Sequence, residues 1–247
     1  MVLAYYGGMY RGFYYDSTYI LVLIGAVICL LASAKVNNTF NRYSRVRSMS
    51  GLTGREAAIR MLNNAGIYDV AVTNCRGQLT DHYDPRRRTV YLSEPVYNST
   101  SVAAIGVACH ECGHAIQHKE NYTPLTVRSS LVNVANIGST LSWPIIIAGV
   151  IFGGMGANSA IGYMLIQVGI IAFSLAVLFQ LVTLPVEFNA SNRALRAIAG
   201  NGIFTDEELK GARNVLMAAA LTYVASAVSA ILQLLRLILL FGGRRRD

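Results

Sequence analysis

The sequence predicts a mainly α-helical integral membrane protein with a small β-hairpin, an α+β arrangement with about four membrane segments. Of its 247 residues, 53% are hydrophobic and 14% are charged, whereas soluble domains carry about 25% charged residues. The stretch 129–186 contains no Asp, Glu, Lys or Arg. The composition therefore excludes a disordered or collagen-like chain and argues against a soluble globular protein.

Residues 1–34 form an N-terminal extension and the first membrane helix, whose apolar part is Ile20–Ala34. Basic residues, beginning with Lys35 and Arg42, follow this helix closely, so the positive-inside rule places residue 35 onward in the cytoplasm. The small residues at positions 32–34 also resemble a signal-peptidase site, so the helix is either a retained span or a cleaved leader.

Residues 35–128 are polar and long enough for a small domain with its own core. Thr53 with Glu56 forms a capping-box signature, and an apolar stripe of helical period follows it. A second helix is expected after residues 98–100, ending at about Lys119. These signals predict two helices on the cytoplasmic side.

Two short strands are expected between these helices, at Val70–Val72 and Thr89–Leu92. The turn-rich segment Asp81–Pro85 lies between them. The sequence therefore predicts a small hairpin of these two strands.

The uncharged stretch 129–186 is long enough for a membrane helical hairpin, because roughly 20 helical residues cross the hydrocarbon. We expect spans at Leu131–Phe152 and Ile161–Leu184, joined by the glycine-rich connection Gly153–Ala160. Two crossings return the chain to the side that it left.

The remaining chain divides into residues 187–214 and residues 215–247. A second capping signature, Thr205 with Glu208, precedes the last apolar segment, Val215–Leu235. If that segment spans the membrane, the basic tail 244–246 would lie outside. It therefore either crosses the membrane or lies in the interface, and the sequence leaves both open.

The clearest functional motif lies on the second cytoplasmic helix, where the chain reads His110-Glu111-Cys112-Gly113-His114. Residues four apart on a helix face the same way, so the two imidazoles can bind one zinc ion. Glu111 is rotated away from them and can instead act as a general base on a water at the open coordination position. This pattern is typical of zinc-dependent peptide hydrolysis.

Several side chains compete to be the third zinc ligand. His118 lies on the same helix and would need a sharp bend to reach the metal, so it is instead a candidate for contact with a ligand side chain or with the substrate. Cys109 and Cys112 lie on the opposite face and are expected to be packing residues. Glu187 is the first charge after the uncharged hairpin and returns to the face of the two histidines, so we expect it to complete a two-His, one-Glu site. Ser191, one turn later, is then a candidate hydrogen-bond partner of a ligand histidine.

His82 is a further candidate, because a histidine near a zinc site can stabilise the oxyanion of a tetrahedral intermediate. The competing interpretation is that Asp81, Asp84 and Pro85 build a turn that includes His82. The strand around Val90 could offer its backbone to an extended peptide.

At these residues the chain resembles a known family, the bacterial YugP-type membrane-bound neutral zinc metallopeptidases, and through it HtpX-like membrane proteases. The resemblance implies a zincin-like peptidase of the bacterial plasma membrane that binds one zinc ion through His110, His114 and Glu187, with Glu111 as the base. Ser191 stands where HtpX-like enzymes usually carry aspartate. The stretches that carry the resemblance are Leu79–Pro85, Leu92–Glu94 with Val96 and Tyr97, Ser101–Ala104, His110–His118 and Leu184–Ser191.

The sequence thus predicts a metallopeptidase whose substrates are membrane or membrane-proximal polypeptides and whose other partner is the lipid bilayer. The alternative is a non-catalytic membrane assembly protein with a structural metal or none. The net charge of +8 does not indicate nucleic-acid binding, because the basic residues cluster at membrane edges without an aromatic–basic motif. The oligomeric state is left open.

Overall fold

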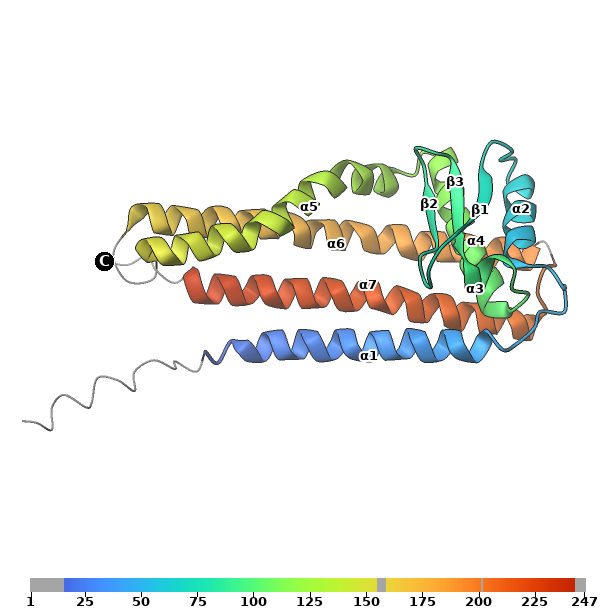
Figure 1. The fold of residues 1–247 in the computed structure, drawn as a ribbon, viewed down its shortest axis with the longest axis horizontal. Coiled ribbons are helices and arrows are strands. Elements are labelled where there is room, and N and C mark those ends of the chain that lie inside the picture. The colour runs from blue at the N-terminus through green and yellow to red at the C-terminus, as the bar shows by residue number, and fades with distance from the viewer. Residues whose placement is uncertain (1–15, 155–158, 201, 243–247) are drawn as a thin grey trace, which may run out of the picture.

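The computed structural model describes residues 16–154, 159–200 and 202–242. Four long helices run alongside one another, and the short helices and strands gather at one end of them (Figure 1). The long helices are α1 (Tyr19–Tyr43), α5 (Thr123–Gly149), α6 (Ala160–Gly200) and α7 (Asp206–Phe241). The smaller elements are α2 (Gly54–Asn64), α3 (Glu94–Tyr97), α4 (Val102–Lys119), β1 (Ala71–Cys75), β2 (His82–Asp84) and β3 (Thr89–Ser93), and a short π-helical turn, η2 (Val150–Gly154), follows α5.

All four long helices are long and apolar enough to cross a membrane. The predicted fold class, mainly α-helical with a small sheet and about four membrane segments, is therefore confirmed. The last apolar segment, which the sequence left open, is part of one of these four helices, α7. The N-terminal extension before residue 16, the connection 155–158 and the basic tail 244–246 lie outside the described residues.

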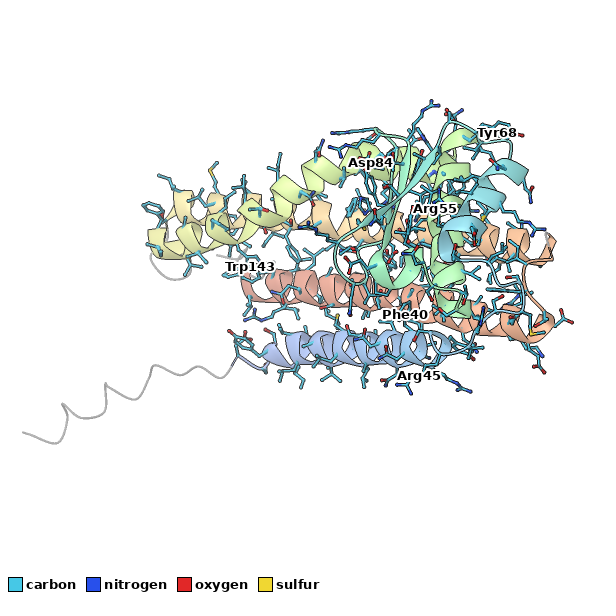
Figure 2. The ribbon with its side chains drawn as sticks, turned by 45° about the vertical axis from the view of Figure 1, so that its right-hand side comes forward. Phe40, Arg45, Arg55, Tyr68, Asp84 and Trp143 are labelled. Carbon is cyan, nitrogen blue, oxygen red and sulfur yellow. The ribbon has the colours of Figure 1, made fainter. Side chains whose placement is uncertain are left out.

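Helix α6 is much longer than a bilayer requires. Its 41 residues extend about 60 Å, twice the roughly 30 Å of a hydrocarbon core. The first part of α6 packs against α5 and the last part against α4. A single helix therefore connects the membrane bundle to the small α/β part. Figure 2 shows the charged residues Arg45, Arg55 and Asp84 at that α/β end.

The sheet has three strands in the order β1-β3-β2, which corrects the predicted hairpin. The two predicted strands do pair, but as the parallel neighbours β1 and β3. The hairpin is instead formed by β2 and β3, which run antiparallel, so part of the predicted turn 81–85 is a strand. Parallel strands need a connection of about a dozen residues or more, and residues 76–88, which include β2, join β1 to β3. Because β3 is central, its backbone around Val90 is already paired on both sides.

The main core lies between α2, the sheet, α4 and the ends of α6 and α7. Both predicted capping boxes are confirmed, at Thr53 with Glu56 and at Thr205 with Glu208. The second helix predicted within residues 35–128 is also confirmed as α4, whose N-cap Ser101 accepts a hydrogen bond from the Ala104 backbone. Thirteen of the eighteen residues of α4 are buried, so α4 is the central helix of the α/β part.

Candidate metal centre

Helix α4 presents His110 and His114 on the side that faces α6. The rings lie one helical turn apart, with centroids 4.9 Å apart and planes nearly perpendicular. Both side chains are mostly shielded from solvent, with 14% and 10% of their surface exposed. The helical spacing predicted from the motif therefore places two imidazoles toward one point.

Gly113 allows α4 to approach α6 closely. A Cβ atom at this position would lie 2.5 Å from the carbonyl oxygen of Ala190 on α6, well inside ordinary contact distance. Only glycine leaves room for this backbone contact, which brings the histidines to within reach of the α6 side chains. The close packing of α4 against α6 therefore explains why residue 113 of the motif is glycine.

Glu187 projects from α6 between the two histidines. Its Oε2 lies 3.2 Å from His110 Nε2 and 3.6 Å from His114 Nε2. The carboxylate is almost completely buried, with 2% of its side chain exposed. The three groups, far apart in the sequence, therefore converge on one small volume.

These three side chains fit a zinc ion. Two ligand atoms that are each 2.0–2.2 Å from a tetrahedral zinc lie about 3.4 Å from one another, close to both nitrogen–oxygen distances. The ligand atoms of the cluster all lie within 4.8 Å of one another. Among the described residues, this is the one group of three or more His, Cys, Asp or Glu side chains that could hold a metal ion. Two histidines and one carboxylate are the ligand set of a catalytic zinc site.

The other ring nitrogen of each histidine is also engaged. His110 Nδ1 lies 3.1 Å from the Ser191 hydroxyl, and His114 Nδ1 lies 3.0 Å from Gln117 Oε1. Partners of this kind orient metal-binding imidazoles and leave Nε2 for the ion. Gln117 was not among the residues singled out from the sequence, although its position three residues after His114 could have suggested it.

Glu111 lines a cavity of about 630 Å³ that His114 and Glu187 also line. Its side chain is 8% exposed, so the carboxylate is accessible from this cavity and shielded elsewhere. The motif predicts a carboxylate that does not bind the metal but reaches its open side. The structure places Glu111 outside the three-residue cluster and on the wall of the adjoining cavity.

Arg128 and Tyr223 also reach this cavity, from α5 and α7 respectively. The Arg128 guanidinium lies 3.1 Å from Glu187 Oε1, the oxygen that faces away from the histidines. It can therefore hold Glu187 so that only Oε2 faces the metal position. Sequence reasoning missed both residues, because nothing local connects a residue of α5 or α7 with the motif on α4.

His118 and His82 do not join the cluster. His118 is exposed, and its Nδ1 lies 2.9 Å from the Tyr83 hydroxyl. His82 lies on the edge strand β2, stacked on Tyr91, with its Nδ1 2.8 Å from the Thr80 carbonyl. Both residues line the outer part of the cavity, so they are placed to contact a bound molecule and not the metal.

Cys109 and Cys112 point into the hydrophobic core, as the sequence predicted. Burial raises the pKa of the Cys109 thiol to about 12 and that of Cys112 well above its usual value. Both thiols lie in the core and outside the cluster of His110, His114 and Glu187. Neither cysteine is therefore placed to supply the fourth protein ligand that a structural zinc site needs.

Comparison with known proteins agrees with this centre. Residues 18–242 match a protein family described as "Putative neutral zinc metallopeptidase". The chain belongs to this family. It is also 46% identical over 230 residues to the "Putative membrane protease YugP" of Bacillus subtilis (strain 168), covering 93% of this chain and 99% of that protein. The resemblance stated from the motifs is therefore confirmed, whereas no solved structure matches the chain.

Proposed function

We propose that this family member is an active membrane-bound endopeptidase that uses one zinc ion bound by His110, His114 and Glu187. The observation that carries the proposal is the convergence of both His Nε2 atoms on Glu187 Oε2, at 3.2 and 3.6 Å, beside a cavity that Glu111 lines. Three protein ligands leave a coordination position open, as catalysis requires and a structural site does not. This favours the peptidase over the non-catalytic assembly protein.

Different side chains around the cavity would take different roles in peptide hydrolysis. A zinc ion at this centre would supply Lewis acidity, which polarises a carbonyl group and lowers the pKa of water. The Glu111 carboxylate would accept a proton from the attacking water and then donate this proton to the leaving amine nitrogen. Ser191, Gln117 and Arg128 would hold the three ligand side chains in place. His82, at the rim, would contact the bound peptide.

The composition of the cavity wall supports a membrane or membrane-proximal polypeptide as the substrate. The outer wall consists of β2 with its neighbours and the end of α4, whereas Leu125 and Val132 of α5 and Tyr223 of α7 form the wall toward the membrane helices. The strand around Val90 is central, and of the two edge strands, β1 and β2, it is β2 whose residues line the cavity. An extended segment leaving the bilayer could therefore pair with β2 while it crosses the metal centre.

The distribution of basic residues supports an active site on the cytoplasmic side of a bacterial plasma membrane. Lys35, Arg42 and Arg45 lie toward the end of α1 that faces the α/β part, and Lys210 and Arg213 lie on the first turns of α7 at the same end (Figure 1). The positive-inside rule assigns such an end to the cytoplasm. Labelling of a cysteine introduced at the exposed residue Tyr68 should then require permeabilised cells, and labelling in intact cells would contradict this orientation.

The decisive experiment compares the wild type with Glu111→Gln, both purified in detergent. We expect both proteins to contain one zinc ion per chain, because Glu111 is not a ligand. Turnover of an unfolded or membrane polypeptide should fall by about 10²–10⁴-fold in Glu111→Gln, because the general base is lost. Glu207→Gln, which changes an exposed carboxylate in the first turn of α7, is a matched control and should retain turnover. Equal turnover by Glu111→Gln would refute the proposed mechanism.

A further inference from the structure

Gln117 links the helix that carries the two histidines to the helix that carries Glu187. It is completely buried, with 0% of its surface exposed. Its Oε1 lies 3.0 Å from His114 Nδ1, and its Nε2 lies 2.9 Å from both the Val186 carbonyl oxygen and Asn189 Oδ1 on α6. A buried amide with every polar group paired can adopt only the orientation that its neighbours permit.

The orientation of this amide can be deduced from chemistry, beginning at Arg193. A guanidinium donates hydrogen bonds and cannot accept them. Arg193 Nε lies 2.7 Å from the side chain of Asn189, so the Asn189 atom that faces it must be the oxygen. The Gln117 atom that faces the same oxygen must then be the amide nitrogen, since two acceptors cannot bond to one another.

A second neighbour requires the same orientation independently. The backbone carbonyl of Val186 is also an acceptor, and it lies on the same side of the Gln117 amide. Two acceptors on α6 therefore require the NH₂ group to point toward that helix. The Gln117 oxygen has to point the other way, toward His114.

The Gln117 oxygen in turn determines where His114 carries its proton. A carbonyl oxygen only accepts, so His114 must present an N–H at Nδ1. In the neutral imidazole, Nε2 then keeps its lone pair, and this nitrogen faces Glu187 Oε2. The ring is thus prepared to bind a cation through Nε2.

We infer that Gln117 is a positioning residue that holds His114 in the Nδ1–H tautomer and joins α4 to α6, with its amide orientation set by the Val186 carbonyl and by Arg193 through Asn189. Arg193 is itself held by Glu120, whose Oε2 lies 2.6 Å from Arg193 NH1. One ion pair and three hydrogen bonds therefore connect Glu120 to His114, in the order Glu120, Arg193, Asn189, Gln117 and His114. The inference rests on the proposed metal centre but not on the peptidase activity.

Two substitutions at Gln117 separate its effect on the His114 tautomer from its effect on the packing of α4 against α6. Gln117→Met keeps a similar shape but loses all three hydrogen bonds. Gln117→Glu keeps an acceptor for His114 but cannot donate to Val186 or Asn189. Gln233→Met, a partly buried glutamine of α7, is the control for the effect of this exchange away from the site.

The measurements are the zinc dissociation constant, from competition with a chelator, and the position of the His114 proton in metal-free protein, from ¹⁵N NMR of labelled histidine. We expect Gln117→Met to weaken zinc binding by about 10–100-fold and to populate the Nε2–H tautomer. Gln117→Glu should retain the Nδ1–H tautomer and bind zinc more tightly than Gln117→Met. Both variants should unfold at lower temperature than the control.

Equal loss of zinc in the two Gln117 variants would overturn the tautomer role, as would an unchanged tautomer in Gln117→Met. If Gln117→Met does not fold, Arg193→Met tests the same connection, and we expect a smaller loss of zinc affinity because Val186 still orients the amide. These readings are independent of turnover. Retained turnover in Glu111→Gln would therefore refute the proposed function without changing the result for Gln117.

Discussion

Two helix pairs of this protein are built differently, and the difference shows which of them has to be precise. Between α4 and α6, a glycine allows backbone contact, and a buried glutamine bonds to two acceptors of the other helix. Between α1 and α7, α1 contributes a single buried residue, Gly25, which packs on Ser229. The α4–α6 pair positions the proposed metal ligands, where a small displacement matters, whereas the α1–α7 pair only has to remain associated in the membrane.

The largest effect is expected from a methyl group placed in the α4–α6 contact. In Gly113→Ala the new Cβ would lie 2.5 Å from the Ala190 carbonyl oxygen, and the backbone can relieve this only if the helices separate. We expect about 1–3 kcal/mol lower free energy of unfolding and at least about tenfold weaker zinc binding, because the ligands move apart. Denaturant unfolding and chelator competition measure the two effects.

Gly25→Ala is the matched change in the α1–α7 pair. Its Cβ would first meet the Ser229 hydroxyl, at 2.8 Å, which can rotate away, and would then lie 3.2 Å from the Ser229 Cα, so the helices need to shift only slightly. We expect a smaller loss of stability than in Gly113→Ala and an unchanged zinc affinity. If Gly25→Ala weakened zinc binding as much as Gly113→Ala, the contrast between the two helix pairs would be wrong.

A moderate effect is expected at the ion pair that joins α7 to the residues before α1. Arg236 NH2 lies 2.9 Å from Asp16 Oδ2, and its guanidinium lies over the Tyr19 ring at 4.1 Å. Arg236→Met should lower the midpoint of thermal unfolding by a few degrees without changing zinc affinity or turnover. In a double-mutant cycle with Asp16→Asn, the two effects should be less than additive, and full additivity would show that the pair does not contribute.

The smallest effect is expected from alkylation of the cysteines, which tests whether the hydrophobic core beside the metal centre excludes solvent and reagent. Because burial raises the pKa of Cys109 from 9.0 to about 12, its thiolate population at a given pH is about a thousandfold lower than that of an ordinary thiol. Alkylation in the native protein should therefore modify Cys75, which is partly exposed, and spare Cys109 and Cys112. Mass spectrometry after brief labelling measures this, and rapid modification of Cys109 would indicate that the core opens.

The sequence was sufficient wherever the information was local. Capping residues, the spacing of His110 and His114 and the uncharged stretch 129–186 each specify a helix or a membrane segment from neighbouring residues. Even the convergence of Glu187 on the histidines followed from a simple count of membrane crossings. The hairpin prediction was wrong because strand pairing depends on contacts across the chain, and two short apolar stretches do not reveal whether they run parallel.

What the sequence alone determined is therefore the class of the protein, its candidate metal-binding motif and the carboxylate that lies beside it. The tertiary structure decided how the ligands are held: Gln117 bonds to residues 69 and 72 positions away, and Arg128 reaches Glu187 from another helix. The reason is physical. A helical period places side chains on a face within one segment, whereas the partner of a buried amide or guanidinium is known only once packing has brought distant segments together.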